Sequence, residues 1–149
     1  WIPKLGRSKS HAWCAGPTAL LPEKVLGIEP ILPGWEKFKI KPNLYDLEWC
    51  EGLVPSLAGD INVKIKKIRK KRLEVGLQIK AIIPKNTTSR LYVPIQKNKS
   101  FKIEVNKNEI WKNGQFFQND SNISFQKKLD NYVVLEFKPG NYTVNAKIN

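Results

Sequence analysis

The chain has 149 residues, of which 41% are hydrophobic and 26% are charged, and 26 lysines and arginines against 13 acidic residues give it a net charge of +13. A chain of this length can form one domain that buries roughly 68–70% of the surface its unfolded form exposes. It holds no apolar run near the ~18 residues of a membrane span, so we expect a folded protein with no membrane partner.

The chain starts at Trp1, contains no methionine, and has no hydrophobic signal-peptide stretch near its start. We therefore expect an excised or truncated piece of a longer protein. The two cysteines, Cys14 and Cys50, are expected to be free thiols in small buried positions. One histidine and two isolated cysteines do not match the ligand spacing of a zinc site. The sequence predicts neither a metal nor a cofactor.

The first predicted element is one short helix in GPTALLPEKVLG, residues 16–27. Pro17 suits a first helical turn, and Gly27 followed by Pro30 is a typical helix end. Pro22 inside the run should kink the helix or shift its start. Pro33 and Gly34 then mark a connector, which places a domain border near Gly34.

The rest of the chain is predicted to be β-sheet. Phe38 and Ile40 alternate with lysines, and a long hairpin follows, in which residues 61–66 and 73–81 alternate on either side of a turn at IRKKR, residues 68–72. Further strands are predicted at LYVPI, FKIEV, YVVLEF and NYTVNAKI, whereas residues 112–122 are expected to form a long loop. The pattern favours a mainly β fold, an antiparallel β-sandwich preceded by one short helix, over a barrel.

A basic run lies on the outward face and tip of the predicted hairpin: Lys64, Lys66, Lys67, Arg69, Lys70, Lys71 and Arg72. Lysines at such positions keep sheet edges from pairing with other chains. Sheets that read RNA or DNA interleave aromatic residues with the charges, and here the intervening residues are isoleucines. We interpret the run as a solvated face and predict no nucleic-acid partner, with a polyanion binder as an alternative.

The acidic residues show no pair that local spacing forces together, as an acid–base hydrolase needs. Ser10 beside His11 lacks the strand–turn–helix context of a nucleophile. The chain alone is therefore predicted to hold no catalytic residues. His11 and Trp13 could bind a sugar by a hydrogen bond and by stacking, or they could simply pack at the helix entry.

Three other tryptophans are expected in ordinary structural positions rather than in a binding site. Trp35 and Trp49 are expected in a core or an interdomain contact, and Trp111, in NEIWKNG, is expected in an exposed turn.

Several motifs resemble the C-terminal region of bacterial α-L-rhamnosidases, glycoside hydrolase family 78. They are SHAWCAGP before the helix, VLGIEP, PGW with FKIKP, LEWCEG, VPSLAGDI, and LEFKPGNYTV near the end. The likeness is specific through about residue 66 and again at residues 135–144. Cys14, Cys50 and the Ser56-Leu57 pair depart mildly from the family pattern.

The resemblance implies that residues 1–34 are the C-terminal remnant of a catalytic (α/α)6 barrel, ending in its last helix, and that residues 35–149 are the β-sandwich that packs against it. Enzymes of this family remove terminal α-L-rhamnose by inversion, with catalytic carboxylates in upstream barrel segments. The implied partners are that barrel and rhamnose-containing glycans, and His11 matches the family's rhamnose-contacting histidine. A bacterial chain of this kind could be secreted, periplasmic or cytoplasmic.

Two further interpretations stay open. The chain could be a free-standing carbohydrate-binding sandwich that uses Trp35, Trp49 or Trp111 as stacking platforms, or a basic polyanion binder whose affinity falls steeply with salt.

Overall fold

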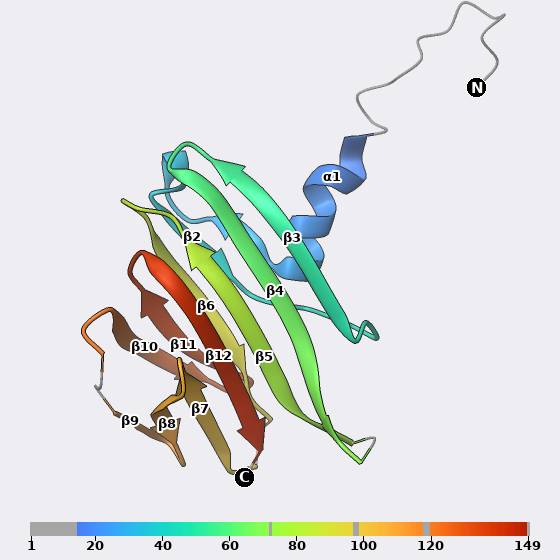
Figure 1. The fold of residues 1–149 in the computed structure, drawn as a ribbon, viewed down its shortest axis with the longest axis vertical. Helices are drawn as coiled ribbons and strands as arrows, with labels where there is room; N and C mark the ends of the chain where they lie inside the picture. The colour runs from blue at the N-terminus through green and yellow to red at the C-terminus, as the bar shows by residue number, and fades with distance from the viewer. Residues whose placement is uncertain (1–14, 72, 97–98, 118–119, 149) are drawn as a thin grey trace, which may run out of the picture.

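The computed structural model describes residues 15–71, 73–96, 99–117 and 120–148. A short helical segment precedes a body made of strands (Figure 1). The helical elements are α1 (Gly16–Leu21), the π-helical turn η3 (Pro22–Leu26) and the 3-10 turn η4 (Pro33–Trp35). The strands are β1 (Ile28–Pro30), β2 (Lys37–Ile40), β3 (Trp49–Ser56), β4 (Gly59–Lys70), β5 (Leu73–Ile83), β6 (Thr88–Pro94), β7 (Phe101–Val105), β8 (Asn108–Lys112), β9 (Gln115–Phe116), β10 (Ile123–Leu129), β11 (Tyr132–Phe137) and β12 (Gly140–Ile148).

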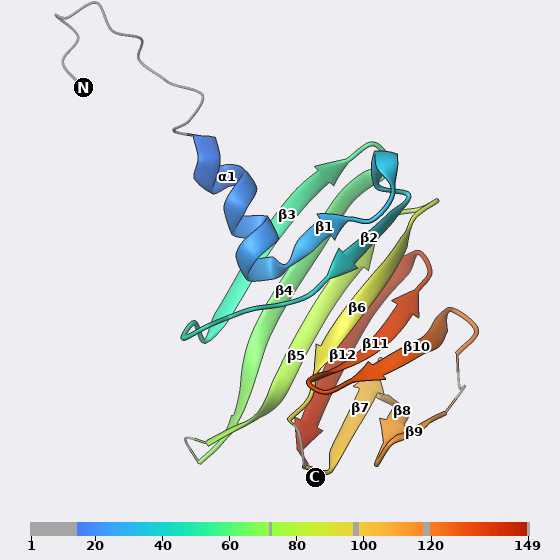
Figure 2. The ribbon, with the colours of Figure 1, turned by 180° about the vertical axis from the view of Figure 1, so that it is seen from behind.

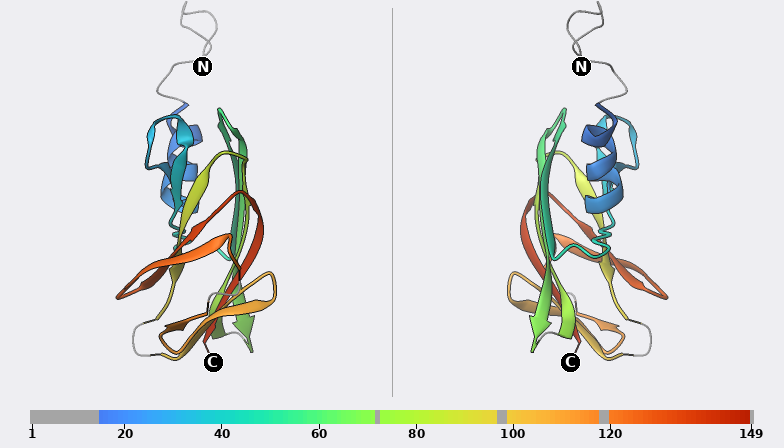
Figure 3. Two further views of the ribbon diagram at one scale, coloured as in Figure 1. Left: turned by 90° about the vertical axis from the view of Figure 1, so that its left-hand side faces the viewer. Right: turned by 90° about the vertical axis from the view of Figure 1, so that its right-hand side faces the viewer.

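The strands form two sheets that face each other, as the edge-on views of Figure 3 show. The five-stranded sheet has the order β1-β2-β6-β11-β10, and the seven-stranded sheet has the order β3-β4-β5-β12-β7-β8-β9. Within the described residues every strand pairing is antiparallel except that of β2 with β6, in which Lys37 lies opposite Thr88. The predicted mainly β sandwich with one short helix is confirmed.

The core lies between the sheets because each long strand alternates inward apolar and outward polar side chains. Ile61, Val63 and Ile65 of β4 are fully buried, and their neighbours on β5 include the fully buried Ile79. Phe137 packs edge-on against Tyr142 with ring centroids 4.8 Å apart. The strands predicted at residues 61–66, 73–81, 91, 101, 132 and 141 are therefore present, but Leu73, predicted on the apolar face of the hairpin, is 71% exposed.

The helix ends at Gly27, as predicted, and its form changes at Pro22. The six residues of α1 have α-helical geometry, whereas η3 begins at Pro22 and is a π-helical turn. Proline cannot donate the backbone hydrogen bond that an uninterrupted α-helix needs there. Gly27 then adopts a left-handed conformation with φ +72° and donates its N–H to the carbonyl of Pro22.

Three details differ from the sequence-based predictions. Strand β4 continues through Lys70, with a bulge between Ile68 and Arg69, so most of IRKKR belongs to the strand rather than to a turn. The predicted loop after Lys112 contains the two-residue strand β9, which pairs with β8. Lys67 does not lie on the outward face, because its side chain is only 11% exposed.

The remaining described residues of the basic run are exposed and partly paired. Lys64 Nζ lies 2.6 Å from Glu51 Oε2, and Arg69 forms an ion pair with Glu48. The hydrogen bond from Arg69 lowers the pKa of the Glu48 carboxyl. Acidic neighbours thus neutralise part of this face, as the interpretation of a solvated face expects.

Candidate functional site

An apolar groove runs between the helical segment and the edge strand β3, and we call it the α1–β3 groove. Figure 2 shows α1 beside β3 and β1, standing apart from the body of the sandwich. The groove has a volume of about 470 Å³. Its lining residues are Ala15, Thr18, Ala19, Pro22, Glu23, Ile28, Glu29, Pro30, Trp35, Leu53, Val54 and Pro55.

Helix α1 is apolar but buries none of its residues. Leu20 is 51% exposed and Leu21 is 59% exposed beside the groove, and Leu53, which lines it, is 50% exposed. Six residues are too few for a helix that is stable by itself in water. Contiguous exposed apolar surface of this kind marks an interaction site.

The backbone at Gly27 fixes the point at which the helical segment leaves the sandwich. Leu26 is buried and packs onto β3 where Gly52 leaves room, since a Cβ at Gly52 would approach Leu26 Cδ1 to 2.5 Å. Gly27 crosses the backbone of Lys41 so closely that a Cβ there would overlap the Lys41 carbonyl. Lys41 N donates to Gly27 O at 2.9 Å, which continues the pairing of β1 with β2.

The acidic residues at the groove are both paired with lysines. Glu29 Oε2 lies 3.0 Å from Lys39 Nζ, and Glu23 forms an ion pair with Lys24. The hydrogen bond to Glu23 raises the pKa of the Lys24 ammonium. With its charges satisfied within the chain, the groove offers apolar surface and shape rather than acid–base chemistry.

The three tryptophans that the structure describes lie in different surroundings and differ in exposure. Trp35 lines the groove in a half-buried position, with its ring centroid 6.2 Å from that of Phe38. Trp49 is 58% exposed on β3, with Lys64 Nζ 5.6 Å from its ring centroid. The prediction for Trp111 was wrong, because this residue is 4% exposed in the core on β8. Trp111 therefore cannot serve as a stacking platform.

His11 and Trp13, the predicted sugar contacts, lie outside the described residues. Cys14 lies there too, whereas Cys50 is a free thiol in a half-buried position. Among the residues that the structure describes, no group of three or more His, Cys, Asp or Glu side chains could hold a metal ion. No helix in the described part of the chain is long and apolar enough to cross a membrane.

Comparisons with known proteins identify both the fold and the family. Solved structures that match include an α-L-rhamnosidase from Dictyoglumus thermophilum, at 18% identity and a TM-score of 0.69 over 87% of this chain. An α-L-rhamnosidase from Streptomyces avermitilis complexed with L-rhamnose matches at 15% identity and a TM-score of 0.63, also over 87% of this chain. The chain spans 13% and 10% of the lengths of these two proteins.

A search of curated proteins found no match. The model of the bacterial α-L-rhamnosidase C-terminal domain matches residues 27–108, more than half of the chain. This match begins at Gly27, the residue that ends the helical segment, and it confirms the resemblance seen in the sequence motifs. The chain belongs to the family of bacterial α-L-rhamnosidase C-terminal domains.

Proposed function

We propose that this chain is the C-terminal region of an α-L-rhamnosidase-like glycoside hydrolase and that its role is structural. The sandwich packs against a helical catalytic barrel formed by the preceding part of the same polypeptide. The observation that carries this proposal is the α1–β3 groove, an apolar surface formed between a helix that buries none of its residues and Leu53 of β3. A helix of this kind is what a barrel would contribute as its final element.

Burial of the groove supports this role energetically. Fully covering an exposed leucine side chain stabilises a contact by about 1.5–3 kcal/mol, so Leu53, which lines the groove and is 50% exposed, can contribute about half of that. The paired lysine and glutamate side chains at the rim give the polar boundary that interfaces between domains usually have. The groove therefore has an apolar centre and a satisfied polar edge.

The proposed division assigns residues 1–34 to the barrel remnant and residues 35–149 to the sandwich. Strand β1 lies in the first segment but pairs with β2 of the second, in a register that places Ile28 opposite Ile40. The two segments are thus continuous in space, and the groove is lined by both. This continuity favours a fixed rather than a loosely tethered arrangement of the barrel and the sandwich.

The parent enzyme is proposed to remove terminal α-L-rhamnose by inverting hydrolysis, with catalytic carboxylates in the barrel. His11 and Trp13 are proposed to contact the sugar at the rim of that active site, since they directly precede the helical segment in the sequence. The isolated chain is proposed to have no hydrolytic activity. Assay of the 149-residue chain with 4-nitrophenyl α-L-rhamnopyranoside should release no nitrophenol, and clear turnover would overturn this part of the proposal.

Interface variants in the longer polypeptide test the groove itself. Leu53→Asp places a charge in the groove, and Leu73→Asp is the matched control, because Leu73 is 71% exposed on β5 and does not line the groove. In calorimetry the parent should unfold its barrel and sandwich together. Leu53→Asp should split this transition in two, whereas Leu73→Asp should leave it single. Identical behaviour of the two variants would show that the barrel does not pack in the groove.

A further inference from the structure

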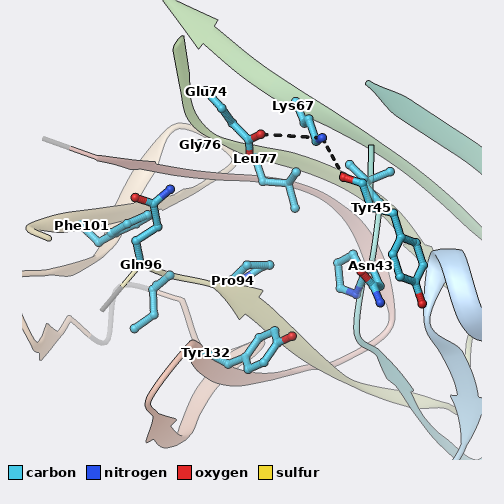
Figure 4. A pocket seen from close by; sticks show the side chains of 13 residues that line it. Asn43, Tyr45, Lys67, Glu74, Gly76, Leu77, Pro94, Gln96, Phe101 and Tyr132 are labelled. Carbon is cyan, nitrogen blue, oxygen red and sulfur yellow. Dashed lines mark hydrogen bonds and ion pairs between the residues drawn. The ribbon is translucent and has the colours of Figure 1, made fainter. Parts of the chain in front are cut away.

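A second cavity lies on the sandwich itself, away from the α1–β3 groove, and we call it the Tyr132 cavity. It forms where the loop after β2, the β4–β5 hairpin, the end of β6 and the start of β11 meet, and its volume is about 280 Å³. The lining residues that matter for its chemistry are Asn43, Lys67, Glu74, Pro94, Gln96 and Tyr132. Figure 4 shows Tyr132 and Pro94 on one wall and Lys67, Glu74 and Leu77 on the other.

The charged wall is internally neutralised. Lys67 Nζ donates to the backbone carbonyl of Tyr45 at 3.0 Å and lies 3.7 Å from Glu74 Oε2. The Lys67 side chain is 11% exposed, whereas that of Glu74 is 44% exposed. The ammonium is thus occupied by protein acceptors, and the carboxylate is the more accessible partner. This wall can accept hydrogen bonds from hydroxyl groups.

The opposite wall is a pre-positioned aromatic and proline surface. Lys41 Nζ lies 5.1 Å from the ring centroid of Tyr132, and the Tyr92 ring meets the Tyr132 ring edge-on at 6.0 Å. These two contacts fix the tyrosine ring before any ligand arrives. Pro94 lies opposite Tyr132 in the pairing of β6 with β11, so its ring extends the same wall. Such a rigid amphipathic surface suits the C–H face of a sugar ring.

Two primary amides stand at the ends of the cavity. Figure 4 shows the side chains of Asn43 and Gln96 approaching it from opposite sides. The backbone of Asn43 is held by its N–H, which donates to Val25 O at 2.9 Å. Each amide offers both donors and an acceptor, the combination that neighbouring hydroxyl groups of a sugar require.

We propose that the Tyr132 cavity binds one neutral pyranose unit of a glycan. The aromatic wall would receive the C–H face of the ring, the two amides would bind hydroxyls from its sides, and Glu74 would accept a hydroxyl hydrogen bond from the far wall. Its volume lies just below the usual range for small-molecule sites, which suits a single sugar unit. Because the cavity is formed entirely by the sandwich and its loops, the proposal does not rest on the barrel or on catalysis.

Titration of the ¹⁵N-labelled chain with methyl α-L-rhamnopyranoside, followed by NMR, tests the proposal. A single sugar with few contacts should bind with a Kd on the order of a millimolar. Saturable shifts are expected at the backbone amides of Gly76, Leu77 and Gln96 and at the Asn43 side-chain amide. Glu74→Gln should raise the Kd, because a neutral amide oxygen is a weaker hydrogen-bond acceptor than a carboxylate.

Two variants and a control locate the site. Asn43→Ala and Gln96→Ala should each raise the Kd by roughly 2- to 12-fold, the effect of one lost hydrogen bond. Asn62→Ala, which changes an amide on β4 that does not line the cavity, should leave the Kd unchanged. No saturable shift at about 50 mM sugar, well over ten times the expected Kd, would overturn the proposal. Shifts confined to the surroundings of Trp49 would overturn it as well.

Discussion

The close crossing of Gly27 over Lys41 makes a quantitative prediction about stability. Substitution of Gly27 by alanine forces an L residue into φ +72°, which costs about 1–2 kcal/mol. The new Cβ would also lie 2.8 Å from Lys41 N and overlap the Lys41 carbonyl, so the two backbones must separate. Separation weakens the 2.9 Å bonds from Lys41 N to Gly27 O and from Asn43 N to Val25 O, each worth about 0.5–1.5 kcal/mol. The expected total loss is about 2–5 kcal/mol.

Gly34→Ala is the matched control, because Gly34 has nearly the same φ, +67°, and its Cβ would meet no atom within 4 Å. It should lose only the conformational cost of about 1–2 kcal/mol. Both variants reduce the entropy of the unfolded chain equally, so this contribution cancels in the comparison. Urea unfolding followed by far-ultraviolet circular dichroism measures the two free energies, and it avoids the fluorescence of Trp35 beside Gly34. Equal losses in the two variants would refute the role of the crossing.

Three further predictions concern side chains of the sandwich. Ser89 is fully buried, and its Oγ has no hydrogen-bond partner among the residues that the structure describes. Ser89→Ala should therefore raise the free energy of unfolding in urea by about 1 kcal/mol, and a lower free energy of unfolding would show that the hydroxyl is hydrogen-bonded. Burial raises the pKa of the Cys50 thiol to about 11. Alkylation of Cys50, monitored by peptide mass spectrometry, should therefore be slower than that of free cysteine at neutral pH and should accelerate up to about pH 11. Rapid labelling at neutral pH would contradict this expectation. Burial raises the pKa of the Glu136 carboxyl, but hydrogen bonds from Lys37 and Arg90 outweigh this effect and leave the pKa lowered. Glu136→Gln should therefore lower the free energy of unfolding near pH 7. The difference from the wild type should disappear as the pH falls well below about 4, where the wild-type carboxyl also becomes protonated. A difference that is independent of pH would refute the electrostatic explanation.

The alternating pattern in the sequence was sufficient to predict the long strands and their faces. Residues 61–65 and 79–83 place their apolar side chains in the core, as period-2 alternation requires. Strand β1 could not be predicted in this way, because three residues that end in Pro30 carry no period. Its conformation comes from its pairing with β2. The parallel pairing of β2 with β6 joins segments about 50 residues apart, and no local pattern encodes such a pairing.

Trp111 shows why local turn signals can mislead. Asn108 and the Asn113-Gly114 pair suggested an exposed turn around NEIWKNG. A register shift between Ile103 and Glu104 gives β8 an extra residue, and both Ile110 and Trp111 are consequently buried. Consecutive buried side chains break the alternation that the prediction assumed.

The sequence alone could not predict the Tyr132 cavity, because its residues come together only in the folded chain. The Tyr132 cavity combines residues from at least four separate segments, and the chain order of Asn43, Lys67, Gln96 and Tyr132 gives no sign that they meet. The α1–β3 groove was better anticipated, because the helix and its end at Gly27 were predicted. The exposure of Leu20 and Leu21 on α1 depends on the absence of packing against the sandwich, which only the three-dimensional arrangement reveals.

The abrupt change at Gly27 also has a consequence for proteolysis. Before it, α1 buries no side chain, and its backbone opens at little cost in free energy when no partner covers it. After it, Ile28 and the chain that follows are fixed in the sheet by strand pairing. A protease that acts on the separated chain should thus trim α1 first and then slow sharply before Gly27, because Leu26 is buried against β3, leaving a resistant fragment that begins close to the first residue matched by the family model.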